Sequence, residues 1–280
     1  MGWDGPILDN HLHVDPHDGA GLEAIKEFAD AGGTHVLILN NPSWHRHAPV
    51  SERADFAVGF EETIEIADAA SSILSGRAWP VLGVHPGLTS RLLEDRELSA
   101  ADAREILRTG IDAAAERIAA GRALALKSGR PHYPVEDETW SVANEILRYA
   151  FERAAAVDCA VQQHTEEAAE FTVVGEWASA AGLDPDRVVK HYATEPTTGV
   201  VPSAIGRRDV LLEHANTDLV LMETDFLDDP DRPGAVLGPK TIPRRVRWLF
   251  EEGYTEFLET AHIQTPRAVY GIDLPDTLKT

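Results

Sequence analysis

Short apolar runs alternate with longer amphipathic stretches along this chain. The short runs are rich in Val, Ile and Leu, and they predict strands over residues 7–14, 35–40, 79–85, 123–127, 159–164, 188–191, 199–203 and 219–225. The amphipathic stretches predict helices over residues 22–31, 52–75, 100–120, 138–156, 166–181, 207–215 and 243–252, with a closing segment at 265–270. Such regular alternation is typical of a parallel sheet whose strands are joined by crossover helices.

Eight strands, each followed by a helix or a short remnant of one, predict a (β/α)8 TIM barrel of the α/β class. No linker, low-complexity segment or internal repeat interrupts the pattern, so we expect one domain over residues 1–280. The connection before the strand at 199–203 is only TEPTTG, which is too short for a full crossover helix. This weak point leaves a doubly wound open sheet as the alternative fold.

The charge balance is strongly acidic, with 47 Asp and Glu against 25 Lys and Arg and a formal net charge of −22. The acidic residues are spread along the whole chain, which indicates a solvated acidic surface and disfavours non-specific binding to nucleic acid. Because salt screens the self-repulsion of such a surface, we expect a salt-adapted, halophilic source.

The cellular setting is predicted from what the sequence lacks. A single cysteine, Cys159, excludes an intramolecular disulfide and fits a reducing compartment. We find neither a signal-peptide pattern at the N-terminus nor an apolar stretch of the ~18 residues that a membrane span needs. We therefore expect a cytoplasmic protein with no membrane partner.

Metal-ligand side chains stand at the ends of several predicted strands. The first strand ends in His11-Leu12-His13, whose two-residue spacing points both imidazoles to one side. His164 ends the fifth strand, His191 the sixth and Asp225 the eighth. Because active sites of such barrels lie at the C-terminal ends of the strands, these five side chains are expected to share one mouth.

Imidazole and carboxylate ligands suit divalent cations, zinc above all, with manganese, iron, cobalt or magnesium as alternatives. Five protein ligands exceed the three that an open catalytic zinc site uses, which favours two metal ions. Two close cations need an anionic bridge, and the strand at 123–127 ends in Lys127 where such a bridge is expected. A buried lysine extending toward solvent, or a shifted register with Ser128 facing inward, are the alternatives.

Several motifs, in order along the chain, resemble the TatD-like metal-dependent hydrolases, particularly their archaeal branch, within the amidohydrolase superfamily. They are ILDNHLHVD, VLGVHPG, GRPHYP, VQQHTE, VVKHYA and LMETDFLDDPDRPGAVLGPKTIPRRV. The resemblance implies a barrel with a binuclear centre. On the family pattern, His11, His13 and Asp225 hold one metal, and His164 and His191 hold the other.

The chain departs from this family at Lys127, where TatD-like proteins usually carry a bridging glutamate. Phosphotriesterase-like members of the superfamily have a lysine that CO2 converts to a bridging carbamate. We therefore hypothesise a carboxylated Lys127, because a protonated amine has three donors and no acceptor for a cation. The alternative is an unmodified lysine that replaces one metal by its own charge.

The resulting expectation is a metal-dependent hydrolase in which a metal-activated hydroxide attacks an ester, lactone, amide or phosphoester bond. Asp225 would be the general base. A small molecule is the expected substrate. A TatD-type deoxyribonuclease acting on phosphodiesters is the alternative, with nucleic acid as substrate, and a non-catalytic metal-binding barrel is a third. The sequence does not predict the oligomeric state.

Further residues near these strand ends are weaker candidates. Those expected to contact substrate are His85, Arg130, His132, Tyr192 and the loop residues Trp44, His45, Arg46 and His47. Asp9 and Glu223 are expected to orient metal ligands rather than to bind metal. Asp228 and Asp229 follow the last strand, and the sequence does not decide whether they line the pocket.

Overall fold

The strands form one parallel sheet that curls into a barrel. A computed structural model of the protein describes residues 2–44, 50–231 and 237–279. The sheet runs in the order β8-β7-β6-β5-β4-β3-β2-β1-β9. The strands are β1 Leu8–His13, β2 His35–Leu39, β3 Ala78–Gly83, β4 Ala125–Gly129, β5 Ala160–His164, β6 Val188–Ala193, β7 Val201–Ile205, β8 Leu221–Glu223 and β9 Phe226–Leu227.

Closure of the barrel depends on the last two strands. β9 begins two residues after β8 ends, so together they occupy the predicted eighth strand. β8 pairs with β7, and β9 pairs with β1, both in parallel. The split strand therefore joins the two edges of the sheet, and the (β/α)8 TIM-barrel class predicted from the sequence is confirmed.

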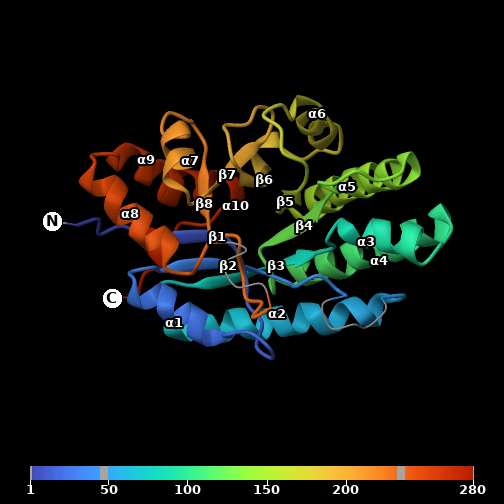
Figure 1. The fold of residues 1–280 in the computed structure, drawn as a ribbon, viewed down its shortest axis with the longest axis horizontal. Coiled ribbons are helices and arrows are strands. Elements are labelled where there is room, and N and C mark those ends of the chain that lie inside the picture. The colour runs from blue at the N-terminus through green and yellow to red at the C-terminus, as the bar shows by residue number, and fades with distance from the viewer. Residues whose placement is uncertain (1, 45–49, 232–236, 280) are drawn as a thin grey trace.

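The helices lie around the outside of the strands (Figure 1). They are α1 Leu22–Asp30, α2 Arg53–Ile73, α3 Gly87–Ser90, α4 Ala100–Ala119, α5 Asp137–Val157, α6 Thr172–Ala180, α7 Arg208–Glu213, α8 Thr241–Glu251, α9 Thr255–Glu259 and α10 Thr265–Tyr270. Single turns of π-helix follow α3 and α9, at Arg91–Asp95 and Thr260–Gln264. Short 3-10 turns lie at Pro185–Arg187 and Pro275–Thr277. No helix of the described residues is long and apolar enough to cross a membrane.

Two connections differ from the expected pattern. The helix expected at 166–181 begins only at Thr172, because residues before it pair with a distant segment: the Phe171 amide donates to the Thr198 carbonyl, and the Thr198 amide donates to Ala169. The helices α3 and α9 are not predicted from the sequence, because they are too short for a clear amphipathic pattern. The helix-free link between β6 and β7, by contrast, is as predicted.

A register shift in β1 brings its histidines to the site. Leu8 belongs to an apolar cluster with one or two residues from each of the strands β2 to β8 and with Tyr270 from α10. Strict alternation from Leu8 would turn His11 away from the interior. The pairing of β1 with β2 shifts register between Asp9 and Leu12, as at a β-bulge. His11 and His13 therefore both line the cavity above this cluster.

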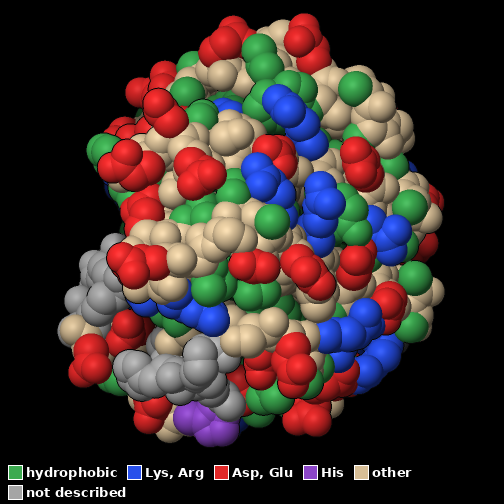
Figure 2. All heavy atoms as spheres, turned by 90° about the vertical axis from the view of Figure 1, so that its right-hand side faces the viewer, with side chains coloured by type: hydrophobic (Ala, Val, Ile, Leu, Met, Phe, Trp, Pro, Cys, Tyr) green, Lys and Arg blue, Asp and Glu red, His purple; other side chains and the backbone are tan. Residues whose placement is uncertain are grey.

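The acidic surface is distributed rather than concentrated. On the face drawn in Figure 2, Asp and Glu side chains are interspersed with Lys and Arg. Elsewhere on the surface, exposed ion pairs include Arg122 with Glu61 and Lys240 with Glu27. Exposed pairs contribute little stability, typically about 0–1 kcal/mol. The charged side chains on this surface are therefore mostly exposed to solvent, as expected from the acidic sequence.

Candidate metal centre

A cavity opens at the C-terminal ends of the strands. Its lining consists of His11, His13, Pro42, Trp44, His85, Lys127, His132, His164, His191, Asp225, Leu227 and Asp229. All six residues expected to hold metal are in this set, and they come from β1, β4, β5, β6 and the segment between β8 and β9. Their convergence follows from parallel strands that all end at the same rim.

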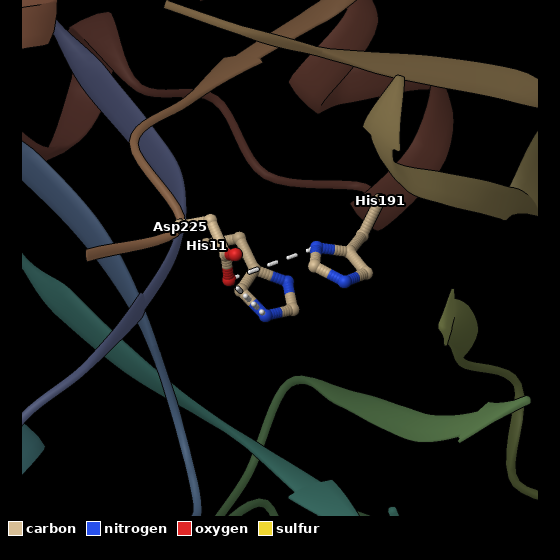
Figure 3. A group of neighbouring side chains, drawn as sticks. All are labelled: His11, His191 and Asp225. Carbon is tan, nitrogen blue, oxygen red and sulfur yellow. Dashed lines mark ion pairs between the residues drawn. The ribbon is translucent and has the colours of Figure 1, made fainter. Parts of the chain in front are cut away.

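Three of the six form a compact group (Figure 3). Ligand atoms of His11, His191 and Asp225 all lie within 4.8 Å of one another. His11 Nε2 is 3.7 Å from Asp225 Oδ1, and His191 Nδ1 is 4.0 Å from the same oxygen. Asp225 has a φ of 50°, in the left-handed region that side chains other than glycine rarely adopt. Such backbone strain is common at functional sites.

The remaining candidate ligands lie beside this group. His164 Nδ1 is 2.8 Å from His191 Nε2, so these two ring nitrogens point toward each other. Lys127 Nζ is 3.3 Å from His13 Nε2. Lys127 is almost fully buried, at 2% exposure, and burial lowers its pKa to about 8, although Asp225 and Glu223 oppose this shift. A neutral amine is therefore accessible near neutral pH.

Four of the imidazoles at the cavity favour the neutral form, which is the form that binds metals. Burial, followed by the charges of neighbouring groups, lowers the pKa of His11, His85, His164 and His191 well below the usual value of 6.5. A neutral imidazole has a free lone pair, which a metal requires.

The donor set also fits a divalent cation. His11 Nε2 is buried and has no hydrogen-bond partner in the described part of the chain, although a carboxylate oxygen lies 3.7 Å away. That separation is too long for a hydrogen bond and suits two ligands of one cation. Imidazole nitrogen with carboxylate oxygen is the ligand chemistry of zinc and similar metals.

Two acidic residues, Glu223 and Asp9, contact the candidate ligands or the main chain that carries them. Glu223 Oε1 lies 3.0 Å from His191 Nδ1 and also accepts from the Tyr192 amide at 2.8 Å. Asp9 is expected to orient a metal ligand, and in the structure it contacts the His11 main chain and Thr224 rather than a histidine ring. Its carboxylate accepts from the His11 amide, the Thr224 amide and the Thr224 hydroxyl. Asp9 thereby joins β1 to the turn that carries Asp225.

Among the weaker candidates, Trp44, His85 and His132 line the cavity. His132 Nδ1 lies 2.7 Å from His164 Nε2, and the rings of Trp44 and His85 meet edge to face at 5.2 Å. Asp229 lines the cavity as well. Asp228 does not, because its carboxylate accepts from the amides of three residues in the loop after β1, namely Asp15, Ala20 and Gly21.

Two of the expected substrate contacts are not at the cavity. The Arg130 guanidinium binds Glu166 and lies over the rings of Trp140 and Trp177. This charge is paired with Glu166, and Arg130 is not among the residues that line the cavity. Tyr192 packs against the apolar cluster around α8 instead of lining the cavity.

Some predicted residues are not described by the structure, and some residues of the site were not predicted from the sequence. His45, Arg46 and His47 lie outside the described residues. Sequence reasoning missed Pro42 and Leu227, which line the cavity without carrying any chemical signal. It also missed Gln162, whose amide contacts His11. The alternation of Gln162 with His164 along β5 was a usable signal for that contact.

Comparisons with known proteins agree with this architecture. The family model described as TatD related DNase matches residues 8–270. A protein of Methanocaldococcus jannaschii, itself described as uncharacterized, is 33% identical over 290 residues, covering 96% of this chain and 97% of that protein. An organophosphorus hydrolase from Deinococcus radiodurans has 17% identity and a TM-score of 0.58, covering 96% and 93% of the two chains.

A TatD homologue from Escherichia coli has 16% identity and the same TM-score, with 95% and 98% of the two chains covered. These two structures, being so distant in sequence, show the fold alone. Barrel, site and family together define a metal-dependent hydrolase. The chain belongs to the TatD related DNase family, which confirms the resemblance seen in its motifs.

Proposed function

We propose that this protein hydrolyses an ester, lactone, amide or phosphoester bond of a small molecule at a centre of two divalent cations, with zinc the preferred metal. The observation that carries the proposal is the convergence of six candidate ligands from five parts of the barrel on one cavity. His11, His13 and Asp225 would hold one cation, and His164 and His191 the other. Lys127, as a carbamate, would lie between them.

Divalent cations bound at these positions would lower the pKa of water toward about 7 and polarise the oxygen of the bond to be cleaved. The chain's own residues supply the proton transfer. The Asp225 side chain is 21% exposed, whereas those of His11 and His191 are 1% and 4% exposed. Asp225 is therefore accessible to water and substrate, and it would accept the proton of the attacking water and pass it to the leaving group.

Lys127 has the surroundings that carboxylation needs. The reaction requires an uncharged amine, whose nitrogen attacks the carbon of CO2 and then releases one proton, giving a carbamate with two oxygens. Burial disfavours the ammonium form of Lys127. Lys127 lines the same cavity as His13 and His164, and its amine lies 3.3 Å from His13 Nε2, so a carbamate formed there would lie among the candidate ligands.

The family description favours a second candidate, a deoxyribonuclease acting on phosphodiesters. The acidic charge of −22 weighs against a polyanionic substrate, since phosphate binding depends on basic surface. A small neutral or singly charged substrate is therefore preferred. A non-catalytic barrel is the least supported of the three proposals, because a scaffold has no need of six convergent ligands.

The test is metal content and activity of the wild type, of Lys127→Met and of Lys127→Glu, each loaded with Zn²⁺ with and without bicarbonate. We expect two metals per wild-type chain only with bicarbonate, fewer in Lys127→Met, and two in Lys127→Glu regardless of bicarbonate. A panel of nitrophenyl esters, lactones, phosphotriesters and single-stranded DNA then separates the substrate classes. One metal per chain in every condition would overturn the binuclear proposal.

A further inference from the structure

A buried hydrogen-bond network holds the imidazole of His11 from inside the barrel. His11 Nδ1 lies 2.7 Å from Gln162 Oε1, and both residues are at most 1% exposed. Gln162 is on β5, opposite β1 across the barrel interior. Its role is separate from that of the six candidate ligands, since an amide side chain that faces an imidazole nitrogen acts on the ring and not on a cation.

The orientation of the Gln162 amide follows from its other contacts. Its Nε2 donates to the Asn10 carbonyl at 3.0 Å and to the Tyr270 hydroxyl at 2.9 Å. A main-chain carbonyl only accepts hydrogen bonds, so the amide atom beside Asn10 must be the NH₂ group. The oxygen of Gln162 therefore faces His11.

This orientation fixes the tautomer of His11. An amide oxygen accepts and never donates, so His11 Nδ1 must carry the hydrogen of a neutral ring. The lone pair is then on Nε2, the atom that faces Asp225 Oδ1 at 3.7 Å and lacks a hydrogen-bond partner among the described residues. His11 is thereby prepared to bind a cation through Nε2.

The network extends to the C-terminal helix. The Tyr270 hydroxyl of α10 donates to Asn10 Oδ1 at 2.8 Å, and Asn10 Nδ2 donates to Ser203 Oγ on β7 at 3.0 Å. Burial raises the pKa of the Tyr270 phenol, which therefore keeps its proton. Every hydrogen of the Gln162 amide is used, so the side chain has one orientation.

We propose that Gln162 is a positioning residue that holds His11 as an Nε2 metal ligand, supported by Tyr270 from the C-terminal helix. The proposal rests on the proposed function only in taking His11 as a ligand. Groups that orient a metal-bound histidine typically contribute 10–100-fold in metal affinity. Gln162→Met keeps the length and burial of the side chain but has no acceptor for Nδ1–H.

The chain offers a matched control on the same strand. Gln163 is also 0% exposed, but by alternation it points out of the barrel, and its amide has no hydrogen-bond partner among the described residues. Gln163→Met therefore makes the same chemical change one residue away. We expect Zn²⁺ affinity, measured by chelator competition, to fall about 10–100-fold in Gln162→Met and less than about threefold in Gln163→Met.

A second measurement needs neither metal nor substrate. Long-range ¹H–¹⁵N NMR spectra of the metal-free protein distinguish the two tautomers of a histidine, and His11→Gln assigns the signal. We expect the Nδ1–H form of His11 in the wild type and in Gln163→Met, and a mixture in Gln162→Met. The Nε2–H form in the wild type, or equal metal affinity of the two Met variants, would overturn the proposal.

One further variant separates this proposal from the proposed function. His11→Ala should abolish binding of one cation. If it does not, His11 is no ligand and the proposed function fails with it. If His11→Ala loses the metal while Gln162→Met retains wild-type affinity, only the role of Gln162 is refuted.

Discussion

Glu223 Oε1 lies 3.0 Å from His191 Nδ1, and both side chains are buried. The other ring nitrogen of His191, Nε2, lies 2.8 Å from His164 Nδ1. The contact joins β6 to β8 and places a carboxylate beside the His191 ring. A carboxylate behind a metal-binding histidine also makes that histidine a stronger ligand.

Replacing Glu223 by Leu removes this acceptor and should lower Zn²⁺ affinity about 10–100-fold. Glu223→Gln should lose less, since its amide oxygen still accepts from Nδ1–H. Competition with a chromophoric chelator measures both. Equal affinity of the Leu variant and the wild type would show that Glu223 does not orient His191.

Replacing Asp225 by Asn tests the proposed general base. We expect kcat to fall about 10²–10⁴-fold, the usual contribution of a positioned base. The fold should persist, because Asn fits the same turn and tolerates the left-handed conformation of residue 225. Steady-state kinetics, circular dichroism and metal content on the same samples separate a lost base from a lost ligand. Near-normal turnover would refute the assignment.

Gly129 is required where β4 meets β5. Its φ is 151°, and a Cβ there would lie 1.8 Å from the His164 carbonyl oxygen. Gly129→Ala should therefore cost on the order of 2–4 kcal/mol of unfolding free energy and displace His164. Urea unfolding and metal content measure the two effects.

The control for Gly129 is Gly59 in α2, where no described residue lies within 4 Å of an added Cβ. Gly59→Ala should stabilise the protein by about 0.5–1 kcal/mol, because alanine is the better helix former. Equal effects of the two substitutions would contradict the steric argument for Gly129.

His35 should make the fold sensitive to acid. Burial lowers its pKa to about 4, whereas an unfolded histidine titrates near 6.5. Between these values the unfolded chain binds more protons than the folded one, so stability falls as pH drops from 6.5 to 4. The loss from this residue is about 3 kcal/mol. Above pH 6.5 His35 is neutral in both the folded and the unfolded state, so it no longer makes the unfolding free energy depend on pH.

Urea unfolding of the metal-free protein at pH 7 and pH 4.5 measures this loss. His35→Gln should show a smaller decrease than the wild type, although it also disturbs the contact of His35 with Thr277. His17→Gln is the control, because the His17 side chain is 55% exposed. An undiminished decrease in His35→Gln would show that other groups determine the acid sensitivity.

The net charge of −22 should make stability depend on salt. Repulsion among surface carboxylates is weakened when salt shortens the Debye length. We expect the thermal midpoint to rise from dilute buffer to molar KCl. A midpoint that stays constant or falls would exclude salt adaptation.

The arrangement of the barrel was predictable from local pattern. Each strand is a short apolar run, and its position in the barrel follows from chain order once crossover connections are assumed. Candidate ligands such as His164 and His191 were found because they stand at strand ends. The beginning of α6 was not predictable, because the residues before it pair with Thr198, which is distant in sequence.

The side-chain partners were not predictable in the same way. Arg130 follows a candidate ligand in sequence, a position that predicts anion binding, but Glu166, Trp140 and Trp177 contact its guanidinium. Asp9 was expected at a histidine ring and instead binds main-chain amides. Which partner a charged group finds depends on packing between segments far apart in the chain.

The sequence by itself determined the fold class, the family motifs, the acidic surface and the residue types at the strand ends. Only the tertiary structure decided which of these residues meet. The β1 register shift turns His11 and His13 inward, and Gln162 and Glu223 each contact one ring nitrogen of a candidate ligand, His11 and His191. The physical reason is that apolar periodicity is a local property of the chain, whereas hydrogen-bond partners and bulges arise from contacts between strands.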